Sequence, residues 1–177
     1  MQLAGPNGAG KTSLLRIIAG FAAPDEGDIF WREKSITKSY DEFARELLFI
    51  GHKTGVNAQL TALENVRFWL QIQGYSNEQD LYPLLASIGL VGLEDVPVRT
   101  LSAGQQRRVA LLRLWLNDAK LWILDEPFTA LDKSGVAFLQ DRFTSHLENG
   151  GAILLTTHQD LTTHFNDLQT VTLEYRH

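Results

Sequence analysis

Apolar residues gather along the chain in short runs that have the length of β-strands. These runs are Gln2–Ala4, Asp28–Trp31, Leu47–Ile50, Leu121–Asp125 and Ala152–Thr157. Between the last two runs, four apolar residues recur at helical spacing: Val136, Leu139, Phe143 and Leu147. The order strand, helix, strand implies parallel strands, and strongly apolar strands are typical of a sheet covered on both faces. The pattern therefore predicts an α/β fold with a parallel sheet.

The middle of the chain, from about residue 61 to residue 115, has a helical pattern instead. Thr61–Glu64 and Ser102–Gln105 both match the capping box, in which the first side chain caps a backbone N–H and the fourth reaches back. Between them, one helical face carries Leu81, Leu84, Leu85 and Ile88. Because Pro83 lies in this segment, its helix must either begin near Asp80 or kink.

Length and composition favour one folded domain. The chain has 177 residues, of which 44% are hydrophobic and 21% charged, as in an ordinary globular protein. We interpret residues 1–57 and 118–177 as an α/β core, and residues from about 58 to 117 as a helical subdomain inserted into it.

The charge balance and the absence of cysteine exclude several classes of function. Sixteen Lys and Arg against 21 Asp and Glu give a net charge of -5, without the basic surplus of nucleic-acid binders. A chain without cysteine has no disulfide, no Cys-based zinc site and no thiol nucleophile. Arg113 and Asp118 interrupt the longest apolar stretch. We therefore expect no nucleic-acid partner and a protein that is soluble or at most peripheral to a membrane.

The segment Gly5–Thr12 matches G-x-x-x-x-G-K-T at every fixed position and lies between a predicted strand and a predicted helix. In such a P-loop, backbone N–H groups, the helix N-terminus and Lys11 bind phosphates, while the Thr12 hydroxyl reaches Mg²⁺. An ordinary Gly-rich turn would not be expected to fall in this order of elements. The candidate nucleotide contacts are Gly5, Pro6, Asn7, Gly8, Ala9, Gly10, Lys11, Thr12 and Ser13.

Two adjacent acids, Asp125 and Glu126, stand at the end of the apolar run that begins at Leu121. Asp125 can support a Mg²⁺ ion, and Glu126 can act as general base toward a water molecule. Acids at strand ends are commonly solvated loop residues, and the upstream P-loop favours the functional interpretation.

A second candidate anion site is the start of the helix that Ser102 caps. Its N-terminus, with small residues around it, can accept a γ-phosphate. Because one chain cannot easily bring this distant helix to its own P-loop, we expect the helix to serve the nucleotide of another subunit. Taken alone, a Ser-capped helix is usually structural.

These motifs occur together in a fixed order. The P-loop is followed by Leu101–Gln105, Asp125–Glu126, Thr129–Asp132 and His158. The set, which covers nearly the whole chain, resembles the ATPase subunits of ABC transporters. Two segments are most similar to those of the ATP-binding subunits of the bacterial haem exporter of cytochrome c biogenesis. They are Leu-Ser-Ala-Gly-Gln-Gln-Arg-Arg-Val-Ala-Leu and Thr-Thr-His-Gln.

The resemblance implies ATP hydrolysis with Mg²⁺, coupled to transport. It assigns Mg²⁺ to Thr12 and Asp125, the base to Glu126 and the γ-phosphate sensor to His158. It implies that Ser102, Gly104 and Gln105 complete the nucleotide site of a second copy in an ATP-sandwich dimer. It further implies membrane permease partners, a peripheral position on the cytoplasmic side of the bacterial inner membrane, and no direct haem ligation.

The sequence departs from the family pattern in three places. Ala103 replaces a common glycine, and His52 stands where most relatives have the glutamine of the Q-loop. His52 is therefore assigned to the nucleotide site, although it could simply cap a loop. Only four residues precede Gly5, so we expect the N-terminal β-subdomain, with its adenine-stacking aromatic residue, to be truncated.

The remaining histidines and the alternative functions complete the predictions. His146, His164 and His177 lack the position of His158 after a buried strand, so we expect them to be solvated. One alternative function is a truncated, weakly active or inactive ATP-binding fragment. Another is a soluble ABC-type ATPase without a transport role.

Overall fold

The computed structural model describes residues 1–74, 80–165 and 167–174 of the chain, which divides into two units. The sheet unit comprises Met1–His52, Asp118–Pro127 and Phe143–His177. The helical unit comprises Lys53–Asn117 and Phe128–Arg142. No helix within the described ranges has both the length and the apolar character needed to cross a bilayer.

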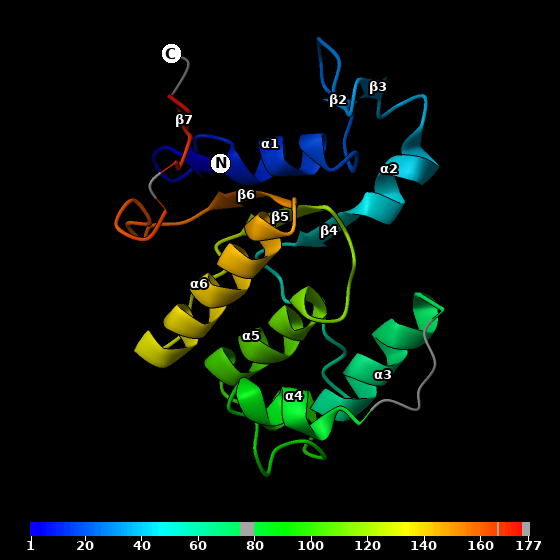
Figure 1. Ribbon diagram of the computed structural model, residues 1–177, viewed down its shortest axis with the longest axis vertical. Coiled ribbons are helices and arrows are strands. Elements are labelled where there is room, and N and C mark those ends of the chain that lie inside the picture. Colours follow the sequence, from blue (N-terminus) through cyan, green and yellow to red (C-terminus); the bar gives the residue numbers. More distant parts are fainter. Residues whose placement is uncertain (75–79, 166, 175–177) are drawn as a thin grey trace. The chain divides into compact units, whose positions relative to one another are not determined.

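The sheet unit is built on five strands in the order β4-β5-β6-β1-β7 (Figure 1). The strands are β1 (Gln2–Ala4), β4 (Leu47–Ile50), β5 (Leu121–Asp125), β6 (Ala152–Thr156) and β7 (Thr170–Thr172). All neighbouring pairs are parallel, which confirms the predicted α/β fold. Every residue of β5, which lies between β4 and β6, is buried, as expected for an apolar strand covered on both faces.

The register of the sheet places the strand ends that matter for function beside one another. Leu124 pairs with Leu155, and Asp125 pairs with Thr156 on β6. On the other side, Ile50 of β4 pairs with Leu124. Because parallel strands end at one edge, the residues that follow β4, β5 and β6 share that edge.

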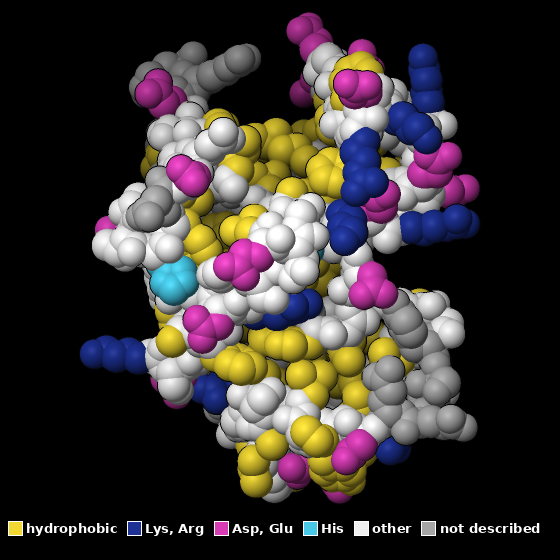
Figure 2. Space-filling model, in the orientation of Figure 1, with side chains coloured by type: hydrophobic (Ala, Val, Ile, Leu, Met, Phe, Trp, Pro, Cys, Tyr) yellow, Lys and Arg dark blue, Asp and Glu magenta, His cyan; other side chains and the backbone are white. Residues whose placement is uncertain are grey.

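Helices α1 (Lys11–Ile18) and α2 (Tyr40–Glu46) belong to the sheet unit. Helix α1 packs its buried Leu15 into a core with Leu3 and Ile123. The predicted strand at Asp28–Trp31 is shorter, because only Phe30–Trp31 pairs as β2, with β3 (Lys34–Ser35). Figure 2 shows basic and acidic side chains interspersed over β2, β3 and α2. Within this group Lys34 pairs with Glu42, and Arg32 pairs with Glu46.

Helix α6 (Lys133–Glu148) corrects two sequence-based expectations. Leu139 and Phe143 are buried as predicted, but Leu147 is 42% exposed. The buried residue of the last turn is His146, which we expected to be solvated. Its ring stacks on Trp122 with centroids 3.6 Å apart and planes 9° from parallel. Stacking on a large aromatic ring explains how an imidazole can occupy a core position.

The helical unit contains α3 (Ala62–Ile72), α4 (Tyr82–Ser87) and α5 (Ala103–Leu111), with 3₁₀ turns η1 (Val98–Thr100) and η2 (Leu112–Leu114). Both predicted capping boxes are confirmed. Thr61 Oγ1 accepts from the Glu64 N–H at 3.1 Å, and the Glu64 side chain accepts from the Thr61 N–H at 2.8 Å. Pro83 lies in the first turn of α4, so this helix begins there rather than kinking.

Candidate active site

The loop between β1 and α1 has the geometry of an anion cradle. Gly8 and Gly10 have φ of 84° and 90°, a conformation that favours glycine, and Gly10 is the N-cap of α1. No side chain caps α1 and no acid lies in its first turn. Its first N–H groups are therefore available to a phosphate, as the P-loop pattern predicts. The predicted phosphate contacts occupy this loop and the first turn: Gly5, Pro6, Asn7, Gly8, Ala9, Gly10, Lys11, Thr12 and Ser13.

Lys11 brings a positive charge to the same loop. Its Nζ donates to the carbonyl of Gly5 at 2.7 Å and to that of Pro6 at 3.0 Å. These two bonds turn the ammonium group back over the loop instead of letting it extend into solvent. A cation and several backbone donors therefore converge on one small volume, which suits a polyphosphate.

A hydrogen bond between Thr12 and Asp125 connects the loop with the end of β5. Thr12 Oγ1 donates to Asp125 Oδ2 at 2.8 Å, and Asp125 is only 3% exposed. Hydroxyl and carboxylate oxygens are the donors that Mg²⁺ prefers. The donor set therefore fits the ion that the P-loop pattern predicts between these two residues.

Glu126 follows β5 directly and has an unusual backbone. Its φ of 52° is in the left-handed region, which non-glycine residues rarely adopt. His158, which lies just beyond β6, places Nε2 3.5 Å from Glu126 Oε1. The side chain of Glu126 is 17% exposed and that of His158 is 68% exposed. The sheet thus brings the two side chains together at one edge.

Thr156 is a residue of this cluster that the sequence reasoning missed. It is fully buried at the end of β6, and its hydroxyl donates to Asp125 Oδ1 at 2.7 Å. Within an apolar strand, a threonine is indistinguishable by pattern from an ordinary core residue. Only the register that pairs Thr156 with Asp125 reveals the contact.

His52 occupies a different position at the same edge. It is exposed and lies two residues after the end of β4, the strand next to β5. This placement is compatible with the sequence-based assignment to the nucleotide site, which stays a prediction.

Ser102, Gly104 and Gln105 lie at the start of α5, in the helical unit. Ser102 Oγ accepts from the Gln105 N–H at 3.3 Å, and the Gln105 side chain accepts from the Ser102 N–H at 2.8 Å. Gly104 lies against the segment Thr129–Asp132, since a Cβ added to it would stand 2.5 Å from the Ala130 carbonyl oxygen. The helix start is therefore both capped and closely packed.

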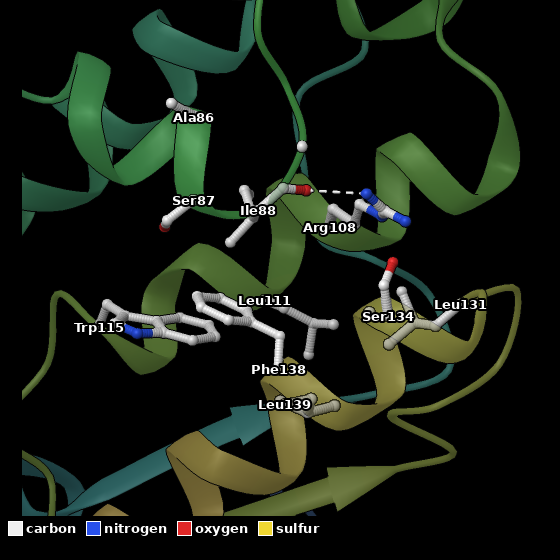
Figure 3. Close-up of a pocket in the computed structure, with 12 residues that line it drawn as sticks. Ala86, Ser87, Ile88, Arg108, Leu111, Trp115, Leu131, Ser134, Phe138 and Leu139 are labelled. Atoms are coloured by element: carbon white, nitrogen blue, oxygen red, sulfur yellow. Dashed lines mark hydrogen bonds between the residues drawn. The ribbon is translucent and has the colours of Figure 1, made fainter.

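Arg108, one turn further along α5, links the same elements. It donates to the Ile88 carbonyl at 3.0 Å and to Asp132 Oδ1 at 2.7 Å. The Gly135 N–H and then the Ser134 hydroxyl, with the Arg108 charge, hold the pKa of Asp132 below its ordinary value. Arg108 borders a cavity of about 330 Å³ in the helical unit, shown in Figure 3.

The sequence profile described as ABC transporter matches residues 1–129. The "Cytochrome c biogenesis ATP-binding export protein CcmA" of Aliivibrio fischeri is 55% identical, over 98% of this chain and 85% of that protein. The protein of the same name from Vibrio vulnificus strain YJ016 is 54% identical, over 91% of this chain and 79% of that protein.

Solved structures agree on the fold. An ATP-binding subunit of an ABC transporter superimposes with a TM-score of 0.83 at 28% identity, over 97% of this chain and 73% of that one. The ATP-binding cassette MJ0796, in a dimeric structure bound to ADP and Pi, gives a TM-score of 0.78 at 24% identity. That superposition covers 98% of this chain and 80% of the other. At this identity the second likeness concerns the fold alone.

Proposed function

Because the chain belongs to the ABC transporter family, and within it to the cytochrome c biogenesis ATP-binding export proteins, we propose that its ATP hydrolysis drives haem export for cytochrome c assembly. The chain is an ABC transporter ATPase. The transported molecule, the residue roles and the partners below are parts of the proposal.

The observation that carries the chemistry is the cluster at one edge of the sheet. Thr12 is bonded to Asp125, and His158 lies beside Glu126. An isolated P-loop would bind phosphate only, whereas this cluster adds a metal-binding pair and a base. The arrangement supports hydrolysis of a bound nucleotide rather than binding alone.

Each residue has a separate task in this mechanism. The loop amides and Lys11 hold the phosphates, while Thr12 and Asp125 hold Mg²⁺. The ion, when bound, neutralises charge that develops on the phosphate oxygens. Glu126 accepts a proton from the attacking water. His158, whose Nε2 lies 3.5 Å from Glu126 Oε1, would contact the γ-phosphate and keep the base oriented.

The start of α5 has its task in a second copy of the chain. Ser102, Gly104 and Gln105 would close on the nucleotide held by the partner's P-loop. The support is the first turn of α5: the capping box occupies the N–H groups of Ser102 and Gln105, whereas those of Ala103 and Gly104 have no intrahelical partner and suit an anion. Closure of two copies would then move permease subunits at the cytoplasmic side of the inner membrane, where this chain would bind peripherally. His52, exposed after β4, would face both the nucleotide and the permease.

The test is complementation of a bacterium from which the gene for its own cytochrome c biogenesis export ATPase has been deleted. We expect the wild-type chain to restore haem-stained c-type cytochromes and to co-purify with membrane permease subunits. Lys11→Ala should bind ATP poorly and restore nothing. Wild-type protein that hydrolyses ATP in solution but neither restores cytochromes nor binds membranes would indicate a non-transport ATPase. Absence of both ATP turnover and complementation would favour the inactive-fragment alternative.

A further inference from the structure

The hydroxyl of Thr156 contacts both acids of the candidate site at once. Thr156 Oγ1 lies 2.7 Å from Asp125 Oδ1 and 2.9 Å from the backbone nitrogen of Glu126. Thr156 itself is fully buried, so water does not compete for these contacts. We propose that Thr156 is a positioning residue that orients both the metal-binding carboxylate and the catalytic base. This inference rests on the roles proposed above for Asp125 and Glu126.

The direction of the two hydrogen bonds is fixed by the chemistry of the groups. An ionised carboxylate can only accept, so the Thr156 hydroxyl donates its proton to Asp125. The same oxygen keeps its lone pairs, and one of them accepts the Glu126 N–H. A hydroxyl can do both, whereas a methyl group in its place can do neither.

The contact with Asp125 sets which oxygen of that carboxylate faces the P-loop. Thr156 holds Oδ1, and Thr12 donates to Oδ2 at 2.8 Å. With Oδ1 held, rotation about the last bond of the side chain is restricted, so that Oδ2 stays directed toward Thr12. Thr156 therefore fixes the carboxylate geometry that the metal-binding pair requires.

The contact with Glu126 supports a strained backbone. At a φ of 52° a residue with a Cβ is disfavoured and persists only where its surroundings hold it. The Glu126 N–H is bonded to the Thr156 carbonyl at 3.2 Å and to the hydroxyl at the shorter 2.9 Å. The hydroxyl thus helps to maintain the turn that directs the Glu126 side chain toward His158.

The experiment compares Thr156→Val, which keeps the shape but lacks the hydroxyl, with Thr156→Ser, which keeps the hydroxyl. Loss of a hydrogen bond to a charged group changes an equilibrium or rate constant by roughly tenfold to hundredfold. We therefore expect the kcat of Thr156→Val to fall by that factor. The KM for ATP should change less than about threefold, because the P-loop is intact. Thr156→Ser should return kcat to within about threefold of wild type.

Two readouts do not depend on turnover. Hydrogen exchange of the Glu126 amide, followed by NMR without nucleotide, should accelerate in Thr156→Val and stay slow in Thr156→Ser. The gain in ATP affinity on adding Mg²⁺ should shrink, by less than about threefold, in Thr156→Val only. Thr157→Val is the matched control for the amide exchange, since the Thr157 hydroxyl accepts from Gln159 and its removal leaves the Glu126 amide bonds in place.

The outcomes separate this inference from the proposed function. Equal kcat and equal Glu126 exchange in wild type and Thr156→Val would overturn the positioning role. Equal losses in the Ser and Val variants would also overturn it, because they would indicate packing instead of hydrogen bonding. If Thr156→Val does not fold, Thr156→Ala supplies the same comparison, because it also lacks the hydroxyl. A wild-type chain that fails in complementation refutes the export function, while the amide exchange still decides the role of Thr156.

Discussion

Substitution of Gly104 by alanine tests the packing of the α5 start in a direction that helix propensity does not predict. In an unobstructed helix, glycine is less stable than alanine by about 0.5–1 kcal/mol, so propensity alone predicts a more stable variant. Here the new Cβ would stand 2.5 Å from the Ala130 carbonyl oxygen, where ordinary contacts begin at 3.4 Å. The backbone must therefore retreat by roughly 0.9 Å, and overpacking of this kind typically costs 1–3 kcal/mol.

The two effects leave a net destabilisation of up to about 2.5 kcal/mol, which in a chain of this size lowers the melting temperature by up to about 10 °C. The assay is thermal unfolding of the nucleotide-free protein. Ala103→Gly is the control, since Ala103 is exposed at the preceding position and its replacement reports local propensity alone. A Gly104→Ala protein that melts above wild type would refute the described contact with Ala130.

Three further predictions concern catalysis, pH and helix capping. Glu126→Gln should slow hydrolysis by roughly 10²–10⁴-fold while ATP stays bound, because an amide cannot accept the water proton; near-normal single-turnover rates would remove Glu126 from that role. Because the pKa of Asp132 in the folded protein is lower than its ordinary value of 3.8, its ionised carboxylate stabilises the fold at pH values above 3.8. This stabilisation is lost as the pH falls through the lower folded-state pKa. Asp132→Asn should therefore melt below wild type at neutral pH, and the two melting curves should converge below about pH 4; a constant gap would argue against the linkage. Thr61→Ala breaks a capping box and should cost about 0.5–2 kcal/mol in chemical denaturation, whereas no change would mean that Glu64 alone satisfies the helix end.

The central strands, the capped helices and the P-loop could be predicted because each depends on local pattern. The run Leu121–Asp125 is apolar up to its last residue, and the structure buries all of it between β4 and β6. The boxes at Thr61 and Ser102 are local motifs, so no distant residue is needed to form them. For the same reason, the Gly-rich loop between β1 and α1 was recognisable from eight residues.

The errors occurred where tertiary contacts decide the outcome. Helix α2 was not predicted, since its short, mostly polar sequence buries only Phe43. His146 was expected to be solvated, but Trp122 supplies a stacking partner that no sequence window contains. The close approach of Gly151, where an added Cβ would collide with the His146 ring, gives the imidazole its room. Thr156 escaped notice because its partners lie on another strand.

The two hydrogen bonds that Lys11 donates to carbonyls of the P-loop compete with the binding of a phosphate by the same ammonium group. Two of the three N–H donors of this ammonium group are bonded to the carbonyls of Gly5 and Pro6, at 2.7 and 3.0 Å, so a phosphate that takes more than the third donor must displace one of them. The observed affinity for any phosphate ligand is then the intrinsic affinity multiplied by the fraction of molecules in which Lys11 is released. A single inorganic phosphate makes few contacts in return, whereas a triphosphate can replace both bonds and add the loop amides. Because this factor is the same for every phosphate ligand, only a ligand with high intrinsic affinity, gained from many contacts with the loop amides, occupies the loop to a large extent.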